Sequence, residues 1–169
     1  MNVARLLVLV PLALVTASAR ADAPKAYTSA ALGFSASFPY EVKERVSPEG
    51  GGTAAGVDPK GIMYMVGLTP ANEEVGKRKS VKEQLDDGIA GAVEKVHGKV
   101  ASQKDVKLDK NPGREVEIDL QGGHATFRAF IVGPQVYLIG VVHKDGVPLP
   151  MTPADFFASF QLAKKPAKK

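Results

Sequence analysis

Most of this chain alternates between short apolar runs and polar turns, a pattern that is typical of β-strands joined by hairpins. Residues 34–38 alternate aromatic or alanine side chains with serines, and residues 114–121 alternate aliphatic with mostly acidic side chains. Residues 62–66 and 136–142 are apolar at nearly every position, so we expect them to form central strands covered on both faces. The sequence therefore predicts a sheet that combines one-sided strands with fully buried ones.

One strong helical pattern interrupts the strands. Apolar side chains recur at helical spacing over residues 80–97, and Ser80 forms a capping box with Glu83 at the start. Gly88 and Gly91 lower the helix propensity of the interior, so we expect close packing on the sheet to be the reason that they are tolerated. The predicted core-facing stripe comprises Val81, Leu85, Ile89, Ala92, Val93 and Val96.

Two further features complete the helical part of the chain. Lys82 and Asp86 have the spacing of an i,i+4 ion pair on the outer side of the main helix. Thr152 and Pro153 begin a second, short helix, because Thr is a favoured N-cap and Pro is favoured at the first helical position. This short helix is expected to present three aromatic side chains to the core: Phe156, Phe157 and Phe160.

Glycine, proline and asparagine mark the expected turns. Hairpins are predicted at residues 32–33, 58–61 and 133–134, and Asn111-Pro112-Gly113 is predicted to turn the chain between two strands of the second half. Residues 41–52 are polar, with one proline and three consecutive glycines, so we expect a mobile loop there.

The second half reads as an antiparallel meander with a predictable register. Gly122-Gly123 fits a two-residue hairpin loop, which pairs Gln121 with His124. In that register apolar residues face apolar residues, and Glu117 lies opposite Arg128. The pairing of acid with base supports the register.

The first 23 residues have the order of a targeting segment. Arg5 precedes an aliphatic run over residues 6–15, and two A-x-A cleavage sites follow, ending at Ala21 and Ala23. This order is typical of a secretory signal peptide, and the run is shorter than the about 20 residues that span a bilayer. The sequence therefore predicts an exported protein, periplasmic or secreted, whose single domain covers residues 24–162.

Charge and cysteine content narrow the classes of function. The 169 residues include 22 basic and 18 acidic side chains, a net charge of +4, and no cysteine, which excludes disulfides and thiolate chemistry. Two of the basic residues lie in the leader and four lysines lie in residues 163–169, so the domain between them is slightly acidic. We therefore expect no nucleic-acid binding. The Lys/Pro/Ala tail is expected to be disordered and to make at most weak contact with an anionic membrane.

No residues have the spacing of a catalytic, cofactor-binding or metal-binding site. His97, His124 and His143 are not arranged as a metal-ligand pair, and no serine lies in a G-x-S-x-G elbow. One strand face carries three acidic side chains that can be considered for cation binding, but a solvated surface partly neutralised by Arg128 is the favoured interpretation. These acidic residues are Glu115, Glu117 and Asp119.

Three local motifs resemble a known superfamily. Residues 33–39 read GFSASFP, residues 133–138 read GPQVYL, and residues 155–162 read DFFASFQL. Together with the order of elements they resemble the PsbP/DcrB-like superfamily of small exported bacterial proteins, which has the Mog/PsbP fold. The resemblance implies an α+β fold, with a central antiparallel β-sheet of about six to seven strands, one main amphipathic helix and a short C-terminal helix. It implies no reaction, because this superfamily is mostly non-enzymatic.

Export without a catalytic constellation favours a non-catalytic accessory or binding protein of the bacterial cell envelope. Its unknown protein or polymer partner is expected to bind an open sheet edge or the groove beside the main helix. One alternative is a small-ligand or cation-binding protein that uses the sheet–helix pocket or the acidic strand face. A second alternative is an exported hydrolase, which needs two ionisable groups within hydrogen-bond reach.

The leader generates a direct prediction. We expect the exported protein to begin at Asp22 or Pro24, because signal peptidase cleaves after the small residue that closes an A-x-A site. Mass spectrometry of the intact exported protein measures this terminus. Recovery of a chain that still begins at Met1 would contradict the prediction of export.

Overall fold

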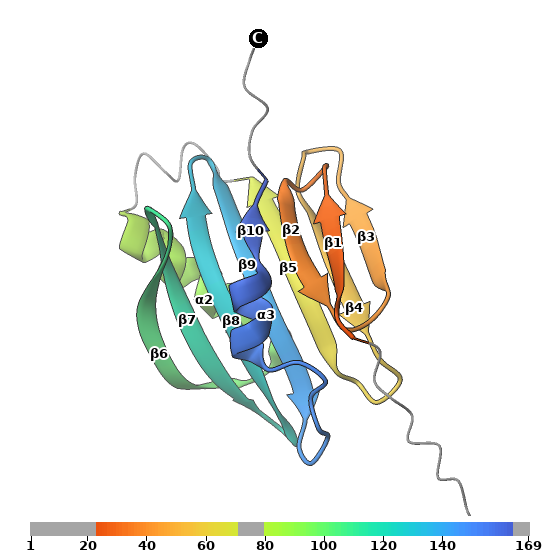
Figure 1. The fold of residues 1–169 in the computed structure, drawn as a ribbon. Coiled ribbons are helices and arrows are strands. Elements are labelled where there is room, and N and C mark those ends of the chain that lie inside the picture. The colour runs from red at the N-terminus through yellow and green to blue at the C-terminus, as the bar shows by residue number, and fades with distance from the viewer. Residues whose placement is uncertain (1–22, 71–79, 164–169) are drawn as a thin grey trace, which may run out of the picture.

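The computed structural model describes residues 23–70 and 80–163 (Figure 1). The leader up to residue 22, the basic run Lys77-Arg78-Lys79 and the tail from Lys164 lie outside the described residues. Within them the elements in chain order are β1 (Lys25–Ser29), β2 (Phe34–Phe38), β3 (Val42–Val46), β4 (Gly52–Val57), β5 (Met63–Pro70), α2 (Val81–Val96), β6 (Lys99–Leu108), β7 (Asn111–Leu120), β8 (Gly123–Val132), β9 (Gln135–Lys144), α3 (Pro153–Ser159) and β10 (Gln161–Leu162).

The strands form two antiparallel sheets. The large sheet has seven strands in the order β3-β4-β5-β9-β8-β7-β6, and the small sheet has three in the order β1-β2-β10. Figure 1 shows the small sheet and α3 on one face of the large sheet and α2 on the other. The predicted α+β fold, with one main helix and a short C-terminal helix, is confirmed.

Two hydrophobic cores lie on opposite faces of the large sheet. The first core joins the small sheet and α3 to one face of β4, β5 and β9, and the second joins α2 to the other face of β7 and β8. Strand β9 serves both, because Ile139 lies in the first core while its neighbour Leu138 packs against the second. Strand β5 does the same with Tyr64 and Met65, although Met65 is only partly buried. Both apolar runs are therefore central strands, as predicted.

The first core is built around aromatic rings. Phe156 of α3 is fully buried and contacts Phe38 and Tyr64 edge to face, with ring centroids 5.1 and 5.2 Å apart. The Tyr64 hydroxyl donates a hydrogen bond to the Met151 carbonyl, just before α3 begins. The three buried rings anchor the C-terminal helix on the sheet, and the one polar atom among them, the Tyr64 hydroxyl, has a hydrogen-bond partner.

Helix α2 has the predicted ends. The Ser80 side chain accepts a hydrogen bond from the Glu83 amide at 3.3 Å, and the Glu83 carboxylate accepts one from the Ser80 amide at 2.7 Å. His97 closes the helix in the left-handed conformation, with φ of 52°. The central residues of the apolar stripe are buried against the sheet: Leu85, Ile89 and Ala92.

Three expectations for α2 are wrong. Val81, the first residue of the predicted core-facing stripe, is 43% exposed. An ideal Cβ at Gly88 or Gly91 has no described atom within 4 Å, so close packing on the sheet does not explain these glycines. Asp86 binds the Arg114 guanidinium instead of Lys82. Arg114 reaches Asp86 because it lies on the helix-facing side of β7, where its side chain is largely buried.

The expected loop over residues 41–52 contains a strand. β3 pairs with β4 without interruption, from Val42 opposite Gly56 to Val46 opposite Gly52. Pattern analysis missed it because β3 is an edge strand in which both faces carry polar side chains.

The predicted turn at Asn111-Pro112-Gly113 is also wrong. Leu108 pairs with Asn111, so the chain turns two residues earlier, and Asp109 adopts the positive φ of 53° that this turn needs. Gly113 lies inside β7 because a Cβ there would overlap the Phe130 ring on the neighbouring strand.

The predicted register of the next hairpin is shifted by two residues. Leu120 pairs with Gly123, so the loop consists of Gln121 and Gly122, and Gly122 has φ of 81°. A shift of two keeps every side chain on its predicted face but changes its partner. His124 therefore lies opposite Asp119, and Arg128 lies opposite Glu115.

The glycines generate a matched pair of substitutions. Gly88→Ala is expected to raise the free energy of unfolding by about 1 kcal/mol, because Ala favours a helix interior and its methyl group meets no described atom. Gly140→Ala is expected to lower it by about 1–3 kcal/mol, because the new methyl group overlaps the Phe127 ring. Urea unfolding measures both. Destabilisation by Gly88→Ala would contradict the description of this helix side as open.

Candidate functional site

The two layers leave two regions of the large sheet uncovered. Cross-strand pairing places Lys43, Ala55, Met65 and Phe127 on one row, so the open side of β3 and β4 is the helix-facing side. We call this region the basic face, defined by Lys43, Arg45, Thr53, Ala55 and Val57. The other region lies beside α3 on the opposite side of β6, β7 and β8, and we call it the paired-charge face, defined by Lys104, Glu115, Glu117, Asp119 and Arg128.

Glu115 is the centre of the paired-charge face. Its side chain is only 9% exposed and accepts from Lys104 Nζ at 2.7 Å and from Arg128 Nε at 2.6 Å. Arg128 in turn lies over the Phe157 ring of α3, 4.6 Å from its centroid. Burial pushes the pKa of Glu115 upward, but the hydrogen bonds and charges of Lys104 and Arg128 outweigh it and lower the pKa.

The other two carboxylates of the acidic row also have partners. The Ser102 hydroxyl donates to Glu117 at 2.9 Å, and Asp119 lies 3.2 Å from the His124 ring. The described residues include no group of three His, Asp or Glu side chains that could hold a metal ion. The acidic strand face is therefore a network of pairs and does not offer a free carboxylate cluster to a cation.

The structure brings together two histidines that the sequence did not connect. His124 and His143 are direct cross-strand neighbours on β8 and β9, with ring centroids 5.8 Å apart, and the second ring nitrogen of His124 lies 3.2 Å from Asp145. The register error at the β7–β8 hairpin hid the contact of His124 with Asp119. Among the described residues no hydrogen bond joins a serine hydroxyl to a histidine ring.

The expected groove beside the main helix is present. A hollow of about 620 Å³ lies between α2 and β6, with Ile89, Val93 and Val100 among its apolar lining residues. Its buried charge, Arg114, binds Asp86 of α2 and donates from Nε to a β6 carboxylate oxygen at 3.1 Å. The buried guanidinium in the groove is therefore already paired with carboxylates of the protein.

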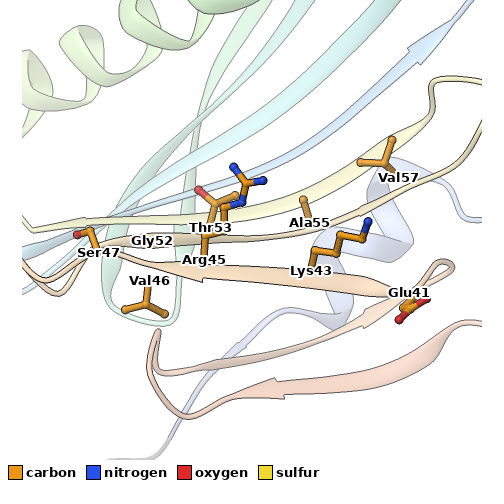
Figure 2. Close-up of a pocket in the computed structure, with 9 residues that line it drawn as sticks. All are labelled: Glu41, Lys43, Arg45, Val46, Ser47, Gly52, Thr53, Ala55 and Val57. Atoms are coloured by element: carbon orange, nitrogen blue, oxygen red, sulfur yellow. The ribbon is translucent and has the colours of Figure 1, made fainter.

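The basic face carries a second hollow of about 670 Å³ (Figure 2). Figure 2 shows Lys43 and Arg45 rising from β3 on the same side as Thr53 and Ala55 of β4. Among its nine lining residues Glu41 is the one acid, and it immediately precedes β3. The side chains of β4 that line the hollow are small, so they leave open space beside the long cationic side chains of β3.

The alternation of β3 separates its charges. Lys43 and Arg45 point to the basic face, while Glu44 points to the other side and accepts a hydrogen bond from the Tyr27 hydroxyl at 2.6 Å. Burial and this hydrogen bond raise the pKa of Tyr27 to about 12, so the phenol stays protonated and keeps donating. The two cations make no ion pair or side-chain hydrogen bond with any described residue.

No candidate site residue was assigned from the sequence, and the basic face was missed with its strand. The signal was present as Lys43 and Arg45 two residues apart, which in a strand places both on one face. It was overlooked because the surrounding residues suggested a loop.

Glu115 generates a prediction about pH. Glu115→Gln is expected to lower the free energy of unfolding by about 1–3 kcal/mol at neutral pH, because two charged donors lose their anionic acceptor. The pKa of Glu115 is lower in the folded protein than in the unfolded chain, so its contribution is present above the unfolded pKa and is lost as the pH falls through the folded pKa. Denaturant unfolding from pH 7 to pH 3 should show the two proteins converging. A constant difference would mean that the carboxylate charge does not stabilise the fold.

Comparison with known proteins identifies the architecture. No protein-family model matches the chain, and no curated protein matches its sequence. The structure is similar to the solution structure of cyanobacterial PsbP (CyanoP) from Synechocystis sp. PCC 6803, with a TM-score of 0.56 and 8% sequence identity, over 82% of this chain and 91% of that one. Neither α2 nor α3, the described helices, has the length and hydrophobicity needed to cross a membrane. The resemblance seen in the local motifs is thus confirmed at the level of structure, and this chain has a PsbP-like fold.

Proposed function

We propose that this chain is an exported, non-catalytic accessory protein of the cell envelope that binds an anionic partner on the basic face. The observation that carries the proposal is the pair Lys43 and Arg45, which are exposed, have no ionic partner within residues 23–70 and 80–163, and lie on a sheet face that no described element covers. A strand face of this kind is available for binding without the rupture of an internal ion pair.

The contrast between the two open faces supports this choice. On the paired-charge face, Lys104 and Arg128 already bind Glu115, so a partner would compete with existing contacts. In the groove beside α2, Arg114 is likewise held by two carboxylates. On the basic face, by contrast, Lys43 and Arg45 bind no carboxylate of the described residues, so a partner would not have to displace one.

The remaining support comes from sequence and fold. The leader has the pattern of a secretory signal, and the motif resemblance is to a superfamily that is mostly non-enzymatic. The described residues show neither a metal cluster nor a histidine-activated serine. The terminal lysines add a second, weaker region of positive charge that is expected to contact anionic surfaces in a salt-dependent way.

Site-specific photo-cross-linking tests the proposal. A photoreactive amino acid replaces Thr53 on the basic face or Gln103 in the groove beside α2, and adducts are sought in intact cells. We expect an adduct from position 53. The double variant Lys43→Glu/Arg45→Glu should abolish it, because the local charge is reversed.

The matched control reverses two charges on the opposite edge strand. Lys99→Glu/Lys107→Glu should leave the adduct from position 53 unchanged, since both lysines lie on β6. Adducts from position 103 alone would assign binding to the groove. An adduct from position 53 that is equally strong in both double variants would exclude recognition through the two cations.

A further inference from the structure

The large sheet ends in two strands with one unpaired edge each. Among the described strands, β3 pairs with β4 alone and β6 pairs with β7 alone. The outer backbone amides and carbonyls of these strands therefore have no strand partner among the described residues. Such edges are the places where an extended segment of another protein can add to a sheet.

The two edges differ in regularity. The register of β6 shifts between Val100 and Ser102, an irregularity that discourages further pairing. The register of β3 runs unbroken against β4 over all five residues. β3 is therefore the edge with the more regular template, although it is short.

Side chains on β3 define what an added strand would meet. In an added strand, the residues opposite Lys43 and Arg45 are two positions apart, and their side chains point to the basic face. Side chains at the alternate positions of the added strand point to the other side of the sheet, where Glu44 is already bound to Tyr27 and Val46 is 48% exposed. Cross-strand neighbours lie close enough for carboxylates to pair with both cations.

Exposed apolar surface lies on both sides of the β3 edge. Among the large hydrophobic side chains that the described residues expose, Val57 points to the basic face and is 57% exposed, and Val46 points to the opposite side and is 48% exposed. A bound strand with small or branched apolar residues beside its acids would cover part of this area.

We propose that β3 accepts an extended acidic segment of a partner protein as an additional strand, with carboxylates at alternate positions paired to Lys43 and Arg45. This inference rests on the proposed function and names the chemistry of the partner. Backbone hydrogen bonds to the β3 edge supply affinity, and the alternate carboxylates select the sequence. An anionic polysaccharide or lipid would use the same cations but would not need the backbone edge.

The test uses the mature chain and a short fluorescent peptide in which Glu alternates with Val. We expect saturable binding by fluorescence anisotropy and hydrogen-exchange protection of β3. Lys43→Glu/Arg45→Glu should weaken the affinity about tenfold, because two favourable charge pairs become repulsive. Lys99→Glu/Lys107→Glu should leave the affinity unchanged.

Two altered peptides make the test specific. N-methylation of alternate peptide bonds removes the N–H groups with which the peptide would donate to the β3 edge, and it should abolish binding. A peptide with Lys in place of Glu should bind the Lys43→Glu/Arg45→Glu variant better than it binds the parent protein. Thermal melts that match the parent protein confirm that each variant is folded.

Contrary outcomes are equally distinct. Undiminished binding of the N-methylated peptide, or equal loss in the β6 variant, would overturn strand addition at β3. Dextran sulfate binding that depends on Lys43 and Arg45, with no peptide binding, would assign the face to an anionic polymer. An adduct from position 53 of the parent protein without peptide binding would refute this inference alone, whereas the absence of that adduct from the parent protein would refute the proposed function as well.

Discussion

The fold depends on one constraint: the large sheet is apolar on opposite faces in its two halves. β9 and β5 lie where the halves meet, so their successive residues enter different cores. A single layer on one face could bury only one of these cores. The chain therefore needs the small sheet and α3 on one side and α2 on the other. The same constraint leaves one uncovered region on each side of the sheet: the basic face on the α2 side and the paired-charge face on the α3 side.

Two neighbouring residues of β7 hold this arrangement together across both faces. Arg114 points to the α2 side and links the helix to the edge strand β6 through Asp86 and Asp105. Glu115 points to the other side and links β6 to β8 through Lys104 and Arg128. Arg114 and Glu115 are both largely buried, so the loss of the ion-pair partners of either one would leave a buried charge without a counter-ion. Two consecutive residues of β7 thus connect this strand to α2, β6 and β8 through ion pairs.

Much of the fold follows from local patterns. The capping box at Ser80, the buried run of β9 and the phenylalanines of α3 are each specified by residues close in the sequence, and all three predictions are confirmed. The faces of residues 114–120 in β7 were also predictable, because alternation survives an error in register. Fold class and the PsbP-like architecture were therefore within reach of the sequence.

The errors concern interactions between elements. A shift of two residues preserves the alternation of apolar and polar side chains, so that alternation could not place Arg128 against Glu115 or His124 against Asp119. Pairing at the hairpin is decided instead by tight contacts, since a Cβ at Gly123 would overlap the backbone of β9. β3 escaped notice because a strand with one neighbour buries little. The candidate site went unrecognised for the same reason.

The charge pattern of β3 has a consequence for the protein's own copies. Two identical β3 edges that met antiparallel about a twofold axis midway along the strand would place Lys43 of one chain against Arg45 of the other, twice. Four cations would then crowd one short seam, with Glu44 turned to the opposite side and engaged by Tyr27. Like charges directly across strands oppose pairing. The edge is thus selective through repulsion: it disfavours self-assembly into longer sheets while it stays open to a segment of opposite charge.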